Sequence, residues 1–293
     1  MSFAAHLTQR HAIGTPMQDL LRATREDGAG ILPPPAPAVE PQPLLAFDRV
    51  SLEYKTDQTV VRATHQVSLS VFEAERYVLL GPSGCGKSTL LKAAAGFIQP
   101  REGSVRLDGQ TIEGPGPDRI VVFQEFDQLP PWKTVLGNVM FPLLATRRLA
   151  KREARERALG VLEQVGLADF AQSYPHQLSG GMKQRVAIAR ALAMQPRVLL
   201  MDEPFASLDA LTRRRMQEEL LALWEEVRFT LLFVTHSIEE ALVVGSRIGV
   251  LTPRPGRLRA EIQAHEFGLA SSGGAAFQAA TQRIHGLLFG EPA

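Results

Sequence analysis

A glycine-rich segment at residues 81–89 holds the residue types that bind a nucleotide phosphate. Its spacing, G-x-x-x-x-G-K-S, is that of a phosphate-binding loop. Glycines let the backbone curl so that successive N–H groups point at phosphate oxygens. Lys87 can then reach the β- and γ-phosphates, and Ser88 can hold Mg²⁺. The residues predicted to contact the nucleotide are Gly81, Pro82, Ser83, Gly84, Cys85, Gly86, Lys87, Ser88 and Thr89.

Two adjacent acids, Asp202 and Glu203, follow the apolar run 198–201 and could supply the rest of a hydrolytic site. Parallel sheets bind ligands at the carboxyl ends of their strands, where these acids would lie. Asp202 would position Mg²⁺, directly or through water, and Glu203 is the best candidate for the general base that acts on the attacking water. Acid pairs at strand ends are common, so this interpretation depends on the presence of the phosphate-binding loop.

The elements around these residues predict an α/β fold. The apolar run 77–80 precedes the loop as a buried strand, and 90–95 follows it in a helix whose N-terminus adds partial positive charge at the phosphates. Strands and helices alternate again from residue 198, which implies a parallel core sheet with helices packed on it. Alternating residues at 45–54 and 64–72 predict antiparallel strands ahead of the core sheet.

The middle of the chain is predicted to be helical, with helices at 147–165 and about 182–194. The two ends differ from the rest. Residues 1–43 form an N-terminal extension with a Pro-rich linker, which we interpret as a mobile tail, with a docking helix as the alternative. Residues 261–293 are interpreted as a C-terminal tail, in which 277–289 would form a last helix.

Composition excludes several classes of protein. The chain has 293 residues, a formal net charge of +1 and a single cysteine, Cys85. Bulk nucleic-acid binding usually needs a strong basic excess, and one cysteine cannot form a disulfide framework or a cysteine metal cluster. No apolar run reaches the roughly 18–20 residues of a membrane-spanning helix, and the N-terminus lacks the pattern of a secretory signal. We therefore expect a cytosolic protein, whose action on a membrane would need other chains.

Residues 178–185, Leu-Ser-Gly-Gly-Met-Lys-Gln-Arg, resemble the signature sequence of the ATP-binding subunits of ATP-binding-cassette (ABC) transporters. The resemblance covers about residues 44–260, with the family's motifs in order. It departs from the family at Glu73-Ala74-Glu75, where a Pro-Gly-Glu turn is usual. It implies a P-loop NTPase fold of the ABC ATPase type, with an antiparallel β subdomain, a helical subdomain at about 125–195, and ATP and Mg²⁺ as cofactors.

The resemblance also implies a homodimer, because the family's signature sequence faces the γ-phosphate that the other subunit binds. Ser179 and the two glycines after it would stand at the start of a helix, so that backbone N–H groups, a hydroxyl and the helix dipole face one anion. Each chain would then hold half of two sites. The residues expected to contact the partner's ATP are Ser179, Gly180, Gly181, Gln184 and Asp209.

Further site residues follow from the resemblance. Gln124 would be the lid glutamine that contacts Mg²⁺ and the attacking water, and His236 the switch that hydrogen-bonds the γ-phosphate. Tyr54 lies where the family stacks an aromatic ring on adenine, although a core tyrosine would have the same pattern. The expected catalytic residues are Glu203, His236 and Gln124, and the expected Mg²⁺ ligands are Ser88, Gln124 and Asp202.

Two functions of an ABC protein remain open: a transporter motor, and a soluble ATPase that acts on DNA or another macromolecule. The second type interrupts the module with long coiled coils or zinc inserts, and residues 125–177 hold neither a heptad array nor a cysteine. Residues 128–139 and 202–209 look most like the nitrate, sulfonate and taurine importers. We therefore favour the motor subunit of a multi-chain importer, with the transported substrate not determined by this chain.

The resemblance to importers implies a set of partners. A second copy of the chain would form the ATP sandwich, and integral membrane permease subunits would contact the segment that includes Trp132. A solute-binding protein would act indirectly, and no nucleic acid is expected. The chain would then lie peripherally at the cytoplasmic face of the plasma (inner) membrane.

Overall fold

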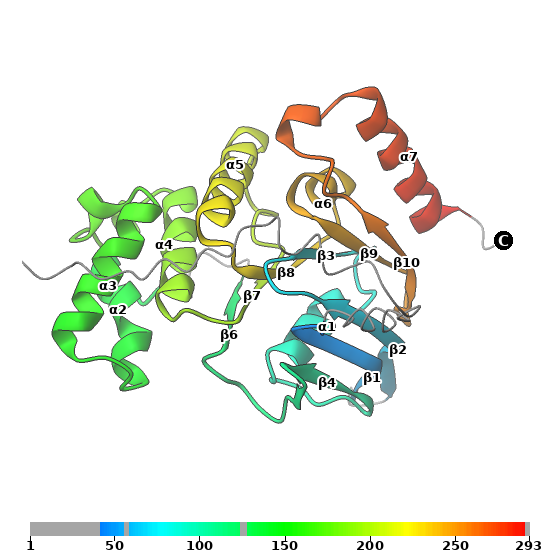
Figure 1. The fold of residues 1–293 in the computed structure, drawn as a ribbon, viewed down its shortest axis with the longest axis horizontal. Helices are drawn as coiled ribbons and strands as arrows, with labels where there is room; N and C mark the ends of the chain where they lie inside the picture. Colours follow the sequence, from blue (N-terminus) through cyan, green and yellow to red (C-terminus); the bar gives the residue numbers. More distant parts are fainter. Residues whose placement is uncertain (1–41, 56–58, 124–127, 291–293) are drawn as a thin grey trace, which may run out of the picture. The chain divides into compact units, whose positions relative to one another are not determined.

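A six-stranded sheet runs through the part of the chain that the computed structural model describes, residues 42–55, 59–123 and 128–290 (Figure 1). Its strand order is β10-β9-β3-β8-β7-β6. All neighbouring strands are parallel except the edge pair of β9 and β10. The predicted parallel core sheet is therefore confirmed. The strands are β3 (Arg76–Leu80), β6 (Arg119–Val122), β7 (Val198–Asp202), β8 (Thr230–Thr235), β9 (Arg247–Leu251) and β10 (Leu258–Gln263).

The central strands are apolar between their end residues because both faces of the sheet are covered. In β3, Val78 and Leu80 belong to one hydrophobic core cluster, and Tyr77 and Leu79 belong to another. The first cluster includes buried residues of helices α4 (Gly180–Ala193), α5 (Ala210–Val227) and α6 (Ile238–Val244). The second includes helix α1 (Lys87–Ala94) and the strands of a second sheet. Alternate side chains of one strand thus pack into two different cores.

The second sheet has the order β2-β1-β4-β5 and is antiparallel throughout. Helix α1 contacts strands of both sheets, so the segment that follows the phosphate-binding loop is held between them. The antiparallel subdomain is the one that the alternating residues predict. Its strands are β1 (Leu45–Lys55), β2 (Val60–Val71), β4 (Glu102–Leu107) and β5 (Gln110–Thr111).

Three helices, α2 (Val135–Ala145), α3 (Lys151–Gln164) and α4, contact one another and form the predicted helical subdomain. Figure 1 shows them grouped beyond β6 and β7, on the side away from β10. The helix predicted at 147–165 begins only at Lys151. Arg147 instead belongs to the end of α2, where its φ of +52° stops that helix, and α3 starts after the extended N-cap residue Ala150.

The C-terminal segment packs on the cassette instead of forming a separate tail. Strand β10 continues to Gln263, so the predicted boundary at residue 260 cuts a strand. Helix α7 (Ala275–Phe289) contacts α6 and β9, and it buries Phe277, Ile284 and Leu288. The edge strand β10 exposes much of its surface, which explains why its apolar pattern is weak. Most of the predicted N-terminal extension, residues 1–41, lies outside the described residues.

The parallel register brings the predicted site residues to one edge of the sheet. Leu80 of β3 pairs with Thr235 of β8, and Asp202 of β7 pairs with Val234 of β8. The phosphate-binding loop, the acid pair and His236 therefore leave three adjacent strands at the same level. Within the described residues, no helix is both long and apolar enough to span a membrane.

Candidate active site

The phosphate-binding loop leaves β3 at Gly81 and enters α1 at Lys87. Gly84 and Gly86 have φ angles of +77° and +100°, which favour glycine. The Lys87 side chain is only 4% exposed, and its Nζ donates to the carbonyl oxygens of Gly81 at 2.9 Å and Pro82 at 3.1 Å. The lysine is therefore folded back over the loop, with its ammonium group on two loop carbonyl oxygens.

Gly86 is also required by a close approach to β2. A Cβ atom at this position would lie 2.6 Å from Cγ2 of Thr64 and 2.9 Å from the carbonyl oxygen of Ala63. Side chains do not tolerate contacts this short against backbone. The last glycine of the loop thus serves both the turn and the packing of the two sheets.

Asp202 meets Ser88 across the start of α1. The Ser88 hydroxyl donates to Oδ1 of Asp202 at 2.8 Å. Burial raises the pKa of the Asp202 carboxyl, and the hydrogen bond from Ser88 lowers it by less. Mg²⁺ is usually held by one or two carboxylates with substrate phosphates and water, and it prefers oxygen ligands. The pair fits that ion. Among the described residues, no group of three or more histidine, cysteine, aspartate or glutamate side chains could hold a metal ion.

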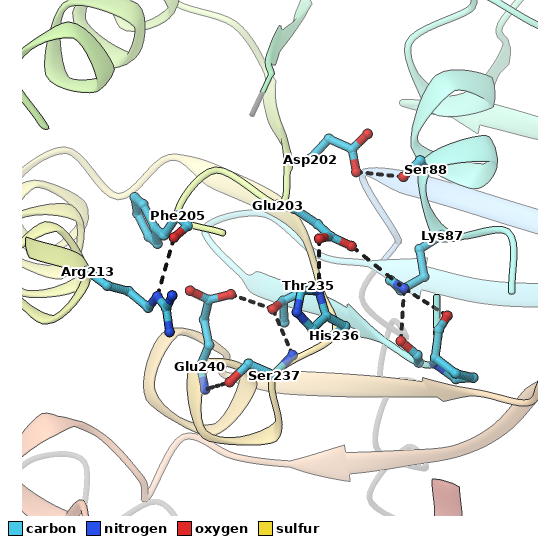
Figure 2. Close-up of polar contacts among 12 residues, drawn as sticks. Lys87, Ser88, Asp202, Glu203, Phe205, Arg213, Thr235, His236, Ser237 and Glu240 are labelled. Atoms are coloured by element: carbon cyan, nitrogen blue, oxygen red, sulfur yellow. Dashed lines mark hydrogen bonds and ion pairs between the residues drawn. The ribbon is translucent and has the colours of Figure 1, made fainter. Parts of the chain in front are cut away.

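Glu203 lies between His236 and Lys87, as Figure 2 shows. Its Oε2 is 2.9 Å from Nδ1 of His236, and its Oε1 is 3.9 Å from Nζ of Lys87. Glu203 has a φ of +45°, an uncommon conformation for a non-glycine residue. Its backbone N–H donates to the carbonyl oxygen of Val234 at 3.0 Å, which ties this turn to β8. The predicted general base and the predicted switch are therefore in direct contact.

The signature residues stand at an exposed helix start. Ser179 is the N-cap of α4, and its Oγ accepts from the backbone N–H of Met182 at 3.3 Å. Asp209 caps α5 in the same way by accepting from Leu211 and Thr212, and these hydrogen bonds lower the pKa of its carboxyl. Within the described part of the chain, no hydrogen bond or ion pair joins Ser179 or Asp209 to the phosphate-binding loop. Their assignment to the partner's ATP stays a prediction.

Three other predicted residues have different outcomes. Gln184 is fully buried, and its amide atoms have no hydrogen-bond partner among the described residues. In this structure, therefore, it does not reach the surface where a partner's nucleotide would bind, contrary to the predicted contact. Tyr54 lies at the end of β1 and is 41% exposed, so it is not a core tyrosine, and adenine stacking stays a prediction. Gln124 lies outside the described residues.

A segment after β9 contacts the phosphate-binding loop and was not predicted. Nε of Arg254 donates to the carbonyl oxygen of Gly84 at 3.3 Å. Gly256 donates to Ala63 and accepts from His65, and a Cβ atom at Gly256 would lie 2.0 Å from the carbonyl oxygen of Cys85. The sequence Pro-Arg-Pro-Gly indicates a turn here. Nothing local in it indicates contact with a loop 170 residues earlier.

Known proteins match this chain over most of the cassette. The family model described as ABC transporter matches residues 64–206. A taurine import ATP-binding protein of Rhizobium johnstonii is 52% identical over 198 residues, which are 68% of this chain and 75% of that protein. A nitrate import ATP-binding protein of Synechococcus elongatus is 48% identical over 219 residues, which are 74% of this chain and 80% of that protein. The chain belongs to the ABC transporter ATP-binding family.

A solved structure agrees with this assignment. The dimeric ATP-binding cassette MJ0796, in a post-hydrolysis state bound to ADP and Pi, matches with a TM-score of 0.65 and 36% sequence identity, and covers 76% of this chain and 100% of that one. The predicted P-loop ABC ATPase fold and the resemblance to nitrate, sulfonate and taurine importers are confirmed. The chain is an ATPase of this family.

Proposed function

We propose that the chain is the ATP-hydrolysing motor subunit of a multi-chain importer, with its catalytic residues at the carboxyl edge of the parallel sheet. The observation that carries the proposal is the contact of Glu203 with both His236 and Lys87, beside the Ser88–Asp202 pair. A base, a polar switch, a phosphate-binding cation and a metal-binding pair stand together there. This is the set that phosphoryl transfer to water requires.

Each residue has a distinct task in the proposed mechanism. The loop N–H groups and Lys87 would hold the β- and γ-phosphates, and Ser88 with Asp202 would hold the metal ion. Mg²⁺, when bound, supplies positive charge that offsets charge on the phosphates. The Glu203 carboxylate takes a proton from the attacking water at one of its oxygens. A carboxylate only accepts hydrogen bonds, so His236 donates to Glu203 through Nδ1. A γ-phosphate oxygen also only accepts, so the ring would bond it through Nε2 as the imidazolium, in which both nitrogens donate.

The two halves of the proposed site come from different chains. Ser179 and the first-turn N–H groups of α4 are oriented for an anion at an exposed helix start, and the related cassette MJ0796 is dimeric. In the proposed dimer, each γ-phosphate bridges the loop of one chain and Ser179 of the other. ATP would then favour the closed dimer, because only that state makes both sets of contacts.

The helical subdomain offers a surface for the proposed membrane permease. The segment that begins at Trp132 lies beside residues 171–173, because Val135 donates to Ser173 and Leu136 donates to Ala171. Exposed aromatic side chains occur on and near both segments, and Trp132 is 75% exposed. Apolar surface of this kind supports a protein contact. The aromatic residues are Trp132, Phe141, Phe170 and Tyr174.

The proposed cargo is a small solute of the nitrate, sulfonate or taurine class, delivered by a separate solute-binding protein. The relatives that import taurine and nitrate match this chain almost equally well, so the two solutes are not separated by similarity. The proposed location is the cytoplasmic face of the membrane, where the permease would hold the cassette. A soluble ATPase acting on DNA is not favoured, because these relatives are import proteins.

Turnover of Mg·ATP by the purified chain and two variants tests the proposed site. Glu203→Gln should lower kcat by about 10²–10⁴-fold and keep ATP binding, because it removes the base and keeps the loop. Lys87→Ala should lose ATP binding. Glu113→Gln alters an exposed acid outside the site and should match the native chain. Normal turnover in Glu203→Gln would refute the assignment of the base, and unchanged ATP affinity in Lys87→Ala would refute that of the loop.

A further inference from the structure

Glu240 is a buried acid that the mechanism above does not use. It lies in α6, four residues after His236, and is only 6% exposed. A buried carboxylate is costly unless hydrogen bonds replace the water it loses. Figure 2 shows its carboxylate directed at Thr235, on the side of the turn away from Lys87. The hydrogen-bond partners of Glu240 therefore indicate its structural role.

The local sequence explains Glu240 only in part. Ser237 and Glu240 have the spacing of a capping box, in which the glutamate would accept from the N–H of the N-cap residue. Ser237 does cap α6, since its Oγ accepts from the N–H of Glu240 at 3.2 Å. The N–H of Ser237, however, donates to Oγ1 of Thr235 at 3.1 Å. The Glu240 carboxylate is thereby released from its usual local partner.

The carboxylate instead joins two distant elements. Oε2 accepts from the hydroxyl of Thr235, the last residue of β8, and Oε1 accepts from Nε2 of Gln217 on α5 at 3.2 Å. Thr235 and Gln217 are themselves buried. Burial raises the pKa of the Glu240 carboxyl, while these hydrogen bonds and the charges of Arg213 and His236 lower it by less.

Both hydrogen-bond partners of the Glu240 carboxylate, Thr235 and Gln217, lie on elements that reach the proposed site. His236 lies between Thr235 and Ser237, whose positions the network holds, and its ring contacts Glu203. On α5, Arg213 is one turn before Gln217 and donates to the carbonyl oxygens of Phe205 at 3.3 Å and Leu208 at 2.9 Å. Those carbonyls belong to the loop that leads to Asp209. One helix is thus bonded both to the turn of His236 and to the loop after Glu203.

We propose that Glu240 is a positioning residue that, through Thr235 and Gln217, holds the turn of His236 against α5 and keeps His236 on Glu203. This rests on the proposed function, in which Glu203 and His236 act at the γ-phosphate. The turn and the 205–208 loop then move as one unit with α5. Loss of the carboxylate frees the turn and separates His236 from Glu203, while the phosphate-binding loop is left intact.

A double-mutant cycle in kcat tests this role. Glu240→Ala should lower kcat by about tenfold, because Glu240 acts through His236. The affinity for a fluorescent ATP analogue should not change, because the phosphate-binding loop is left intact. In a His236→Ala background the same substitution should have no further effect. Glu240→Gln, which keeps an oxygen for Thr235, should restore most of the activity. Glu239→Ala, at the exposed neighbour, should match the native chain.

Two variants of Thr235 test the same link. Thr235→Val keeps the shape of the side chain and removes its hydroxyl, and Thr235→Ser keeps the hydroxyl. Valine should reproduce the loss, and serine should not. Equal losses from Glu240→Ala in the native and His236→Ala backgrounds would overturn the positioning role, as would native kcat in Glu240→Ala. Unchanged kcat in His236→Ala alone would instead overturn the proposed role of His236, and this inference with it.

Discussion

At the scale of residues, the site depends on two adjacent acids that point to different partners. Asp202 ends β7 and accepts from Ser88, while Glu203 contacts His236. Consecutive side chains of a strand point to opposite faces, and at the end of β7 the backbone of Glu203 is left-handed, with a φ of +45°, and donates to Val234. The proposed metal-binding pair and the proposed base can then lie side by side without sharing a ligand.

The pH dependence of stability should report the buried charge of Glu240. A carboxyl with a raised folded-state pKa favours the protonated form, so its contribution to folding is lost as the pH rises from the unfolded pKa, about 4.3, through the folded pKa. Glutamine does not titrate. The free energy of unfolding of the native chain, relative to that of Glu240→Gln, should therefore fall over this window and then level off.

Urea unfolding of both chains from pH 4 to pH 8 measures this difference. Glu239→Gln, at an exposed position, serves as the matched control. A difference that stays constant or grows with pH would contradict a carboxyl whose pKa is raised by burial.

At the scale of elements, the phosphate-binding loop is held by segments from three parts of the chain. The ends of β3 and α1 define it, β2 packs against Gly86, and the turn after β9 packs against Cys85 through Gly256. Arg254 of the same turn bonds Gly84. The loop geometry is therefore determined by packing between sheets as well as by its glycines.

Gly256→Ala should destabilise the protein by about 1–3 kcal/mol and weaken ATP binding. The added methyl group would lie 2.0 Å from the carbonyl oxygen of Cys85, so either the turn or the phosphate-binding loop must move. Gly268→Ala is the control, since a Cβ there has no atom within 4 Å. Denaturant unfolding and fluorescent-nucleotide titration measure the two effects. Equal stability of the two variants would show that the turn does not support the loop.

At the scale of the whole molecule, one chain presents only part of the proposed site. The start of α4, with its Ser179 cap, and the start of α5, with Asp209, are exposed. The related cassette MJ0796 is dimeric. These features agree with a second copy that completes each site.

Glu203→Gln should form a dimer in Mg·ATP and remain a monomer in ADP, because bound γ-phosphate would bridge the two chains. Adding Ser179→Arg should prevent this dimer and keep ATP binding, since the large side chain would occupy the helix start and leave the phosphate-binding loop unchanged. Ser272→Arg, at an exposed position before α7, is the matched control. Size-exclusion chromatography with light scattering measures the mass. A dimer that tolerates Ser179→Arg would refute the composite site.

The sequence alone determined the features that are encoded locally. Three motifs can each be read from a few adjacent residues. They are the glycine and lysine spacing at 81–89, the two acids after an apolar strand, and the serine before two glycines. The order of strands and helices likewise predicts the parallel sheet and both subdomains. These predictions hold because backbone propensity, capping and hydrophobic periodicity act over short distances.

Only the tertiary structure decided which side chains meet. It placed Glu203 on His236 and Gly256 on Cys85, buried Gln184, and packed α7 on the cassette. It also placed the Glu240 carboxylate between Thr235 of β8 and Gln217 of α5, where it links the two elements. Such contacts depend on strand register, helix packing and single backbone angles. Because these are set jointly by segments far apart in the chain, no local pattern encodes them.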